Sequence, residues 1–195
     1  MSRKDPNQGK NEPRGKLDIL HEGELDAQRR FGVEGFWNES SLSGMFSNTI
    51  SKGLADYIER LPFFFIATAN GRGECDCSFR GREFNVSGEP YPLLKVLDPN
   101  TLVFPDYRGN NLFNSLGNLL VNPQIGMLFI DFERRARVRI NGTVEIIEDS
   151  SLYSGIWPQA QRYVQVAPIQ VYGNCNARIP KMVLFPPTDS FFQDE

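Results

Sequence analysis

Apolar positions recur with the period of β-strands along most of the chain between residues 62 and 172. Short apolar or alternating runs are separated by turns rich in Gly, Asn, Asp and Pro, which is typical of strands linked by hairpins. Hairpins at such even spacing favour an antiparallel, Greek-key-like β-barrel, because closure removes exposed sheet edges. We expect six to seven strands, over residues 62–69, 74–81, 93–97, 102–104, 124–132, 136–147 and 163–172. The last has the length of an edge or interface strand, with Pro168 at a bulge.

Helical periodicity is confined to short segments that we expect at the periphery of the barrel. Residues 17–33 predict a helix that ends at Gly32, because glycine readily takes the positive φ of a helix C-terminus. In residues 47–60, Ile50, Leu54 and Ile58 recur every four positions and predict a helix that packs on the sheet. A third helix is expected over residues 111–121.

The polar N-terminus and the length of the chain indicate its domain organisation. Residues 1–16 are rich in Lys, Asn, Pro and Gly, so we expect a disordered arm there. Residues 17–195 contain no linker and are expected to form a single domain. We find neither a signal peptide nor an apolar run long enough to span a bilayer, and three cysteines are not a disulfide framework. We therefore expect a cytoplasmic protein that binds no membrane.

Composition excludes several kinds of chemistry. The chain has one histidine, His21, which rules out a two-Cys, two-His zinc site and an HExxH protease and argues against a Ser-His-Asp hydrolase. A net charge of −3 argues against a protein that tracks nucleic-acid phosphates. Cys75 and Cys77, which share a strand face with Phe79, are interpreted as small core residues, and no metal site is expected. The composition favours cofactor chemistry or none.

The strand over residues 74–81 is a candidate anion site. Alternation places Asp76, Ser78 and Arg80 on one face, where a hydroxyl and a planar guanidinium can converge on one phosphate or carboxylate. Gly81 allows the backbone to approach a ligand closely. The alternative is that Arg80 simply faces solvent.

The loop Asp-Tyr-Arg-Gly-Asn-Asn at residues 106–111 is a second candidate, because it ends a strand and opens a helix. Helix N-termini present free N–H groups and attract anions. Here Arg108, Asn110 and Asn111 could bind a phosphate, or the two Asn side chains could only cap the helix.

A third candidate is the arginine-rich run that opens the strand over residues 136–147. Val138 and Ile140 are expected to face the core, which places Arg137, Arg139 and Asn141 on the opposite face. This basic patch could hold an anionic cofactor or substrate, or it could be a solvated face that discourages edge-to-edge pairing. Both interpretations remain open.

Taken in order, these segments resemble the pyridoxamine 5′-phosphate oxidase-like family, the FMN-binding split β-barrels, and within it a branch of unassigned substrate. The resemblance rests on LPFFFIATANGRGECDCSFRG, on LLKVLDPNTLVFPDYRGNNLFNSLGNLLVNPQIGMLFIDF and on ARVRINGTVEI, and spans roughly residues 20–180. It implies an antiparallel split β-barrel with peripheral helices, and a homodimer with two FMN sites at the subunit interface.

The resemblance also implies which residues hold the flavin. Its phosphate would be bound by Ser78 and Arg80 and by Asn110 and Asn111, where oxidase members carry an Arg-Lys pair. Binding would therefore depend more on the helix N-terminus and Arg80. A polar contact to the flavin ring would come from Arg137 or Arg139. The full set of expected cofactor-binding residues is Ser78, Arg80, Gly81, Arg108, Asn110, Asn111, Arg137 and Arg139.

The implied function is that of an FMN-dependent oxidoreductase acting on an unidentified small molecule, with the chemistry supplied by the cofactor. Residues 172–180 lack the histidine and arginine pattern of true pyridoxamine phosphate oxidases, so vitamin B6 oxidation is not expected. Two alternatives remain: a non-catalytic protein that holds a flavin, haem or deazaflavin on the same barrel, and a dimeric interaction module without a ligand.

Overall fold

The computed structural model describes residues 19–184 and separates the chain into two compact units, Met1–Ser47 and Asn48–Glu195. Each unit is described by itself. The disordered arm expected over residues 1–16 lies outside the described residues. The single domain expected over residues 17–195 stays a prediction.

The first unit contains two helices, α2 (Glu22–Arg30) and α3 (Glu39–Met45). His21 caps α2 by accepting a hydrogen bond from the backbone N–H of Gly23 at 3.1 Å. Gly32 follows α2 with a φ of 70°, which confirms the predicted end of this helix. The helix α3 was not predicted; Ile19, Leu20 and Leu42 form the small core of this unit.

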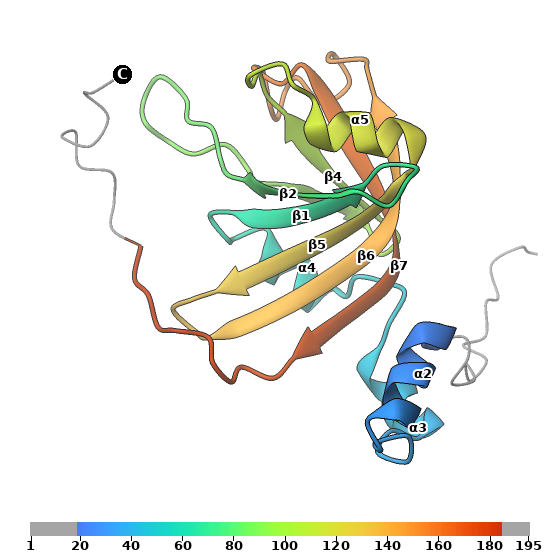
Figure 1. The fold of residues 1–195 in the computed structure, drawn as a ribbon. Coiled ribbons are helices and arrows are strands. Elements are labelled where there is room, and N and C mark those ends of the chain that lie inside the picture. Colours follow the sequence, from blue (N-terminus) through green and yellow to red (C-terminus); the bar gives the residue numbers. More distant parts are fainter. Residues whose placement is uncertain (1–18, 185–195) are drawn as a thin grey trace, which may run out of the picture. The chain divides into compact units, whose positions relative to one another are not determined.

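The second unit is a seven-stranded antiparallel sheet whose order is β2-β1-β5-β6-β7-β4-β3 (Figure 1). Its strands are β1 (Phe64–Ala69), β2 (Cys75–Arg80), β3 (Lys95–Asp98), β4 (Thr101–Asp106), β5 (Gln124–Asp131), β6 (Ala136–Ile147) and β7 (Arg162–Asn174). Because β2 and β3 end the order and do not pair with each other, the curved sheet is a split barrel. The mainly β, antiparallel split-barrel fold is thus confirmed.

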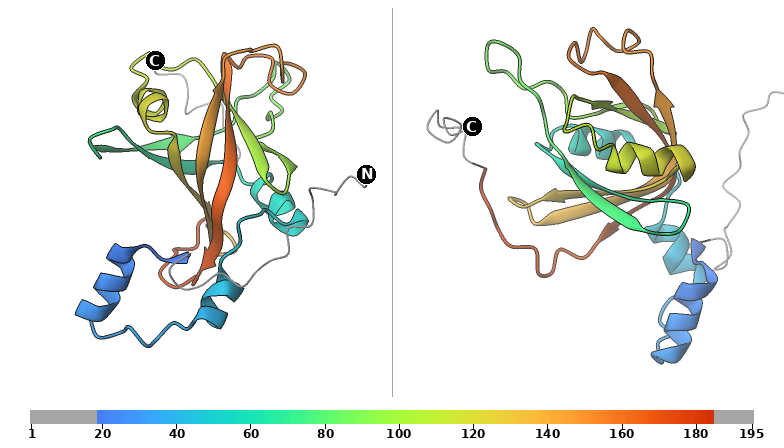
Figure 2. Two further views of the ribbon diagram at one scale, coloured as in Figure 1. Left: turned by 90° about the vertical axis from the view of Figure 1, so that its right-hand side faces the viewer. Right: turned by 45° about the horizontal axis from the view of Figure 1, so that its top comes forward.

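The strand β7 lies between β6 and β4, so the expectation of an edge strand is wrong. Val166, for example, pairs with Leu102 of β4 and with Val144 of β6. Figure 2 shows β6 and β7 running side by side over their length. Pro168 does not interrupt this pairing, because the register shifts beside it: Gly142 faces Pro168 while Asn141 faces Gln170. The bulge predicted at Pro168 is confirmed.

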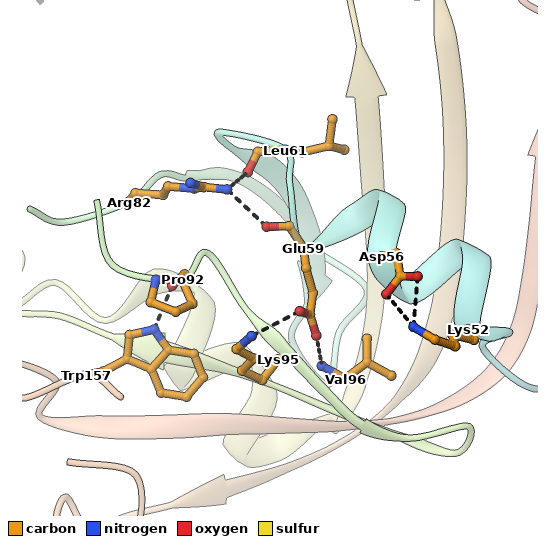
Figure 3. A network of polar contacts seen from close by, with 9 residues as sticks. All are labelled: Lys52, Asp56, Glu59, Leu61, Arg82, Pro92, Lys95, Val96 and Trp157. Atoms are coloured by element: carbon orange, nitrogen blue, oxygen red, sulfur yellow. Dashed lines mark hydrogen bonds and ion pairs between the residues drawn. The ribbon is translucent and has the colours of Figure 1, made fainter. Parts of the chain in front are cut away.

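The helix α4 (Lys52–Ile58) covers one end of the core. Ile50 and Ile58 are buried and Leu54 packs beside them, which confirms the predicted apolar stripe. The residue after α4, Glu59, binds the start of β3: its carboxylate accepts hydrogen bonds from the Lys95 ammonium (3.1 Å) and the Val96 amide (2.8 Å) (Figure 3). These contacts fix the position at which the chain enters β1.

The face of β2 that carries its two cysteines was expected to lie in the core, but in the structure it is the exposed face. Cys75 and Cys77 are exposed, as is Phe79, with 57% of its surface accessible. The interpretation of these thiols as core residues is therefore wrong. The opposite face carries Ser78 and Arg80 and is half-buried, because the helix α5 (Asn114–Val121) contacts it (Figure 1). Among the described helices, none combines the length and the apolar character that crossing a bilayer requires.

Candidate functional site

A cavity of about 400 Å³ lies between the inner face of β2, the loop after β4 and the start of α5. Ser78, Arg80, Asn110 and Asn111 all line it. A neighbouring hollow of about 310 Å³ shares Arg80 and adds Gly81 and Arg108. The structure thus brings six of the eight residues predicted to bind a cofactor to two adjoining cavities.

Arg80 is the central cation of this region. It ends β2 opposite Phe64 of β1, and its side chain is half-buried. Burial lowers the pKa of the guanidinium, whereas the nearby carboxylates of Asp106 and Asp76 raise it. The group stays charged at neutral pH, yet among residues 19–184 no carboxylate forms an ion pair with it. A half-buried cation without a direct partner is a good anion-binding group.

An ion pair between Asp106 and Arg162 supports the wall of the cavity. The two residues face each other across β4 and β7, and their side chains meet at 3.1 Å. Burial raises the pKa of the Asp106 carboxyl, while the positive charges of Arg162 and Arg80 lower it. The Arg162 guanidinium also lies 5.3 Å from the centre of the Phe113 ring. Sequence reasoning missed Arg162, because its role depends on the pairing of two distant strands.

The loop before α5 leaves the helix N-terminus open. The Asn110 side chain accepts a hydrogen bond from the Leu112 amide at 3.0 Å, and Asn111 and Phe113 have φ values of 62° and 55°. Phe113 occupies the N-cap position without any side-chain cap, so the interpretation of the two Asn residues as helix caps is wrong. The first-turn amides of α5 have no cap from a side chain, and Asn114 lines the cavity.

Three side-chain oxygens from β2 and α5 form a tight triangle at the cavity. The Ser78 and Ser115 hydroxyls lie 3.0 and 3.1 Å from one Asp76 carboxylate oxygen and 2.8 Å from each other. An ionised carboxylate only accepts, so the two hydroxyl protons can make two of these three contacts into hydrogen bonds. The triangle therefore offers acceptor lone pairs and negative charge. Sequence alternation placed Asp76 on this face, but nothing in the sequence pointed to Ser115.

Arg137 and Arg139 do not join this site within one chain. Both lie on β6, where Ile140 faces the core as predicted, and neither lines the two cavities. The Arg139 guanidinium lies 5.8 Å from the ring centre of Tyr172, its neighbour on β7. The Nε atom of Arg137 is buried and finds no hydrogen-bond partner within residues 19–184.

A family model described as pyridoxamine 5′-phosphate oxidase matches residues 50–183, which lie in the second unit. The chain belongs to this family. This match confirms the family expected from the sequence. The eight residues predicted to bind the cofactor all lie within the matched segment. The search of curated proteins found no match.

Solved structures of other proteins are similar to this member of the pyridoxamine 5′-phosphate oxidase family. HupZ of Group A Streptococcus is 18% identical, over 64% of this chain and 93% of its own, with a TM-score of 0.48. The haem storage protein HutZ from Vibrio cholerae is 15% identical over 63% and 93%, with a TM-score of 0.43. An FMN-binding protein from Syntrophomonas wolfei is 9% identical over 78% and 98%, with a TM-score of 0.45.

Proposed function

We propose that the chain binds FMN in the cavity around Arg80 and is an FMN-dependent oxidoreductase acting on a small molecule. The observation that carries this proposal is the convergence of two anion-binding features on one cavity. The half-buried Arg80 has no ion-pair partner among the described residues, and the N-terminus of α5 has no side-chain cap.

The residues present fit a ligand with a phosphate at one end and hydroxyl groups beside it. Arg80 and the first-turn amides of α5 would hold the phosphate. The triangle of Asp76, Ser78 and Ser115 would accept hydrogen bonds from ribityl hydroxyls, because the hydrogen-bonding groups that it leaves unused are acceptor lone pairs. A bound flavin would supply hydride or electron transfer. The chain would bind and orient it.

A non-catalytic flavin or haem carrier is the second candidate function. A flavin carrier is favoured by the composition of the two cavities, whose lining includes neither histidine nor cysteine; the same composition lacks the histidine or cysteine that usually ligates haem iron. Their aspartate, Asp106, is engaged with Arg162. The other titratable side chains besides the arginines are Tyr107, whose pKa is raised by burial, and Glu83, which lines only the smaller hollow, so turnover would depend mainly on the flavin.

We also propose a homodimer with the cofactor at its interface. The support is a cluster of Phe63, Phe65 and Phe79, whose ring centres lie 5.2 to 5.9 Å apart. Phe79 is largely exposed and also lines the cavity. A second copy covering this face would bury the cluster. In such a dimer, Arg137 and Arg139 are the residues that we assign to the partner's flavin.

We also propose a cytoplasmic location for the protein. It is supported by the three free cysteines, since disulfides are rare in that compartment.

Flavin binding is tested by titrating the purified protein with FMN and following flavin fluorescence and the absorption band at roughly 450 nm. We expect saturable binding that Arg80→Ala weakens at least about tenfold, together with a smaller thermal shift on adding FMN. Arg72→Ala, at an exposed hairpin turn, is the matched control. A wild-type protein that binds no flavin would overturn the proposal.

Turnover is tested separately by adding NADH or NADPH to the flavin-loaded protein without oxygen. Bleaching of the flavin band supports an oxidoreductase. Stable binding without reduction by either nucleotide would instead support the carrier function.

A further inference from the structure

A larger pocket, of about 550 Å³, opens beside the start of β1; it shares no lining residue with the 400 Å³ cavity and one, Arg82, with the 310 Å³ hollow. Its aromatic wall consists of Phe63 and Phe132, whose ring centres lie 6.2 Å apart. The apolar segment 182–184 borders it and is held there by a hydrogen bond from the Met182 amide to the Phe132 carbonyl at 3.3 Å. The pocket therefore suits a ligand with an apolar body.

Arg82 supplies a cation to this pocket. Its Nη2 atom donates to the carbonyls of Glu59 (3.0 Å) and Leu61 (2.8 Å), which fixes the guanidinium beside the end of α4 (Figure 3). The Nε atom is buried and has no hydrogen-bond partner in the described part of the chain. Burial lowers the pKa of Arg82, and no carboxylate offsets that effect. The side chain is a fixed positive charge without an ion-pair partner among residues 19–184.

Tyr57 adds a hydroxyl that is also unpaired. Its oxygen is buried, and none of the described residues forms a hydrogen bond with it. Burial is the main cause that raises the pKa of this phenol, followed by the charge of Asp131, while Arg134 and Arg60 lower it. The hydroxyl therefore keeps its proton at neutral pH and can donate. Two unsatisfied donors in one pocket call for an acceptor oxygen from a ligand.

We propose that this pocket binds a flat apolar molecule carrying one carboxylate, at a site separate from the 400 Å³ cavity, with Arg82 between this pocket and the 310 Å³ hollow. The carboxylate binds Arg82 and Tyr57, and the apolar body packs on Phe63 and Phe132. A single negative charge fits best, because the lining arginines, Arg60, Arg82 and Arg134, exceed the carboxylates, Asp131 and Glu133, by one. The inference does not depend on flavin binding.

Naphthoate is a suitable probe, and naphthalenemethanol is its neutral counterpart. Calorimetric titration of the full chain should show one naphthoate per chain, bound at least about tenfold more tightly than the alcohol. Arg82→Gln should weaken naphthoate at least about tenfold, and Tyr57→Phe about three- to tenfold. Arg72→Gln, at an exposed turn, should leave its affinity unchanged.

Two features keep the test decisive. Arg82 also binds the backbone at the end of α4, so Arg82→Gln could unfold this end of the unit. Tyr57→Phe retains the aromatic ring, and if Arg82→Gln unfolds, the naphthoate affinity of Tyr57→Phe alone decides the test. Each titration is run with and without FMN, so that a failure of flavin binding is seen separately. Equal affinity for acid and alcohol, insensitivity to Tyr57→Phe, or displacement of naphthoate by FMN would each overturn the proposal.

Discussion

Asp76 determines how the cavity around Arg80 can hold a phosphate. Its carboxylate accepts from the hydroxyls of Ser78 and Ser115, and it also contributes to the charge felt by Arg80. A phosphate bound at Arg80 therefore has a negative group in its vicinity. Like charges in a partly buried site repel strongly, because solvent screens them poorly.

Asp76→Asn is expected to tighten FMN binding about three- to tenfold, since the amide has nearly the same shape but no charge. Riboflavin, which lacks the phosphate, should gain little. Fluorescence titrations with both ligands measure the difference. Asp56→Asn, at an exposed position on α4, is the control. Equal gains for both ligands would contradict this account.

The carboxyl of Asp106 is expected to titrate above its ordinary pKa, because burial is the largest influence on it. A raised pKa in the folded chain means that its contribution to stability is present below the ordinary pKa and is lost as pH rises through the folded value. Arg162→Met removes the largest opposing charge, so the pKa should rise further. Carbon-detected NMR titration of Asp106 in both proteins measures this change.

The stability of Arg162→Met gives an independent measurement. The substitution should cost about 2–3 kcal/mol near neutral pH, where it leaves an ionised buried carboxylate, and less in acid. Denaturant unfolding at several pH values tests this dependence. A cost that does not change with pH would show that the pair matters only through packing.

For single residues, the sequence predicted which side chains lie together wherever the alternation of a strand or the start of a helix determines it. Alternation along β2 correctly placed Ser78 beside Arg80, and the helix-opening loop brought Asn110 into the same cavity. Which face of β2 is covered could not be predicted, because α5 covers it and the contact from Ser78 to Ser115 joins residues 37 positions apart.

Among the elements, β7 has the greatest influence on the sheet, because it joins β6 to β4. Strand pairs joined by short turns could be predicted, as for the hairpins of β1 with β2 and of β5 with β6. The pairings of β1 with β5 and of β4 with β7 could not, since no local signal encodes them. Pro168 suggested an edge, but the bulge lets an interior strand carry it.

Gly142 is where β6 accommodates that bulge. A Cβ atom there would lie against the Ala167 carbonyl oxygen and 2.9 Å from a methyl carbon of Val166. Gly142→Ala should therefore lower the free energy of unfolding by about 2–3 kcal/mol, as measured by urea denaturation. Gly126→Ala on β5 is the control, because its nearest neighbour would lie at an ordinary 3.5 Å. Equal effects of the two substitutions would contradict this interpretation.

At the scale of the whole molecule, the cluster of the exposed Phe79 with the half-buried Phe63 and Phe65 is the feature that a single chain leaves unexplained. Phe79→Asp places a charge in the middle of this cluster. If two copies meet there, the variant should be monomeric in sedimentation experiments and should bind FMN less tightly. Val86→Asp, at a fully exposed loop position, should leave the association state unchanged. A wild-type protein that is already monomeric would contradict the proposed dimer.

Cys75 and Cys77 lie on the same strand face as Phe79, and their exposure gives that face a chemical reporter. Thiol reagents react at rates set by access to the sulfur. Cys175 is also exposed but lies beyond β7, so it serves as an internal reference. If two copies cover this face, labelling of Cys75 and Cys77 should slow relative to that of Cys175 as the protein concentration rises. This would detect the association without any substitution in the chain.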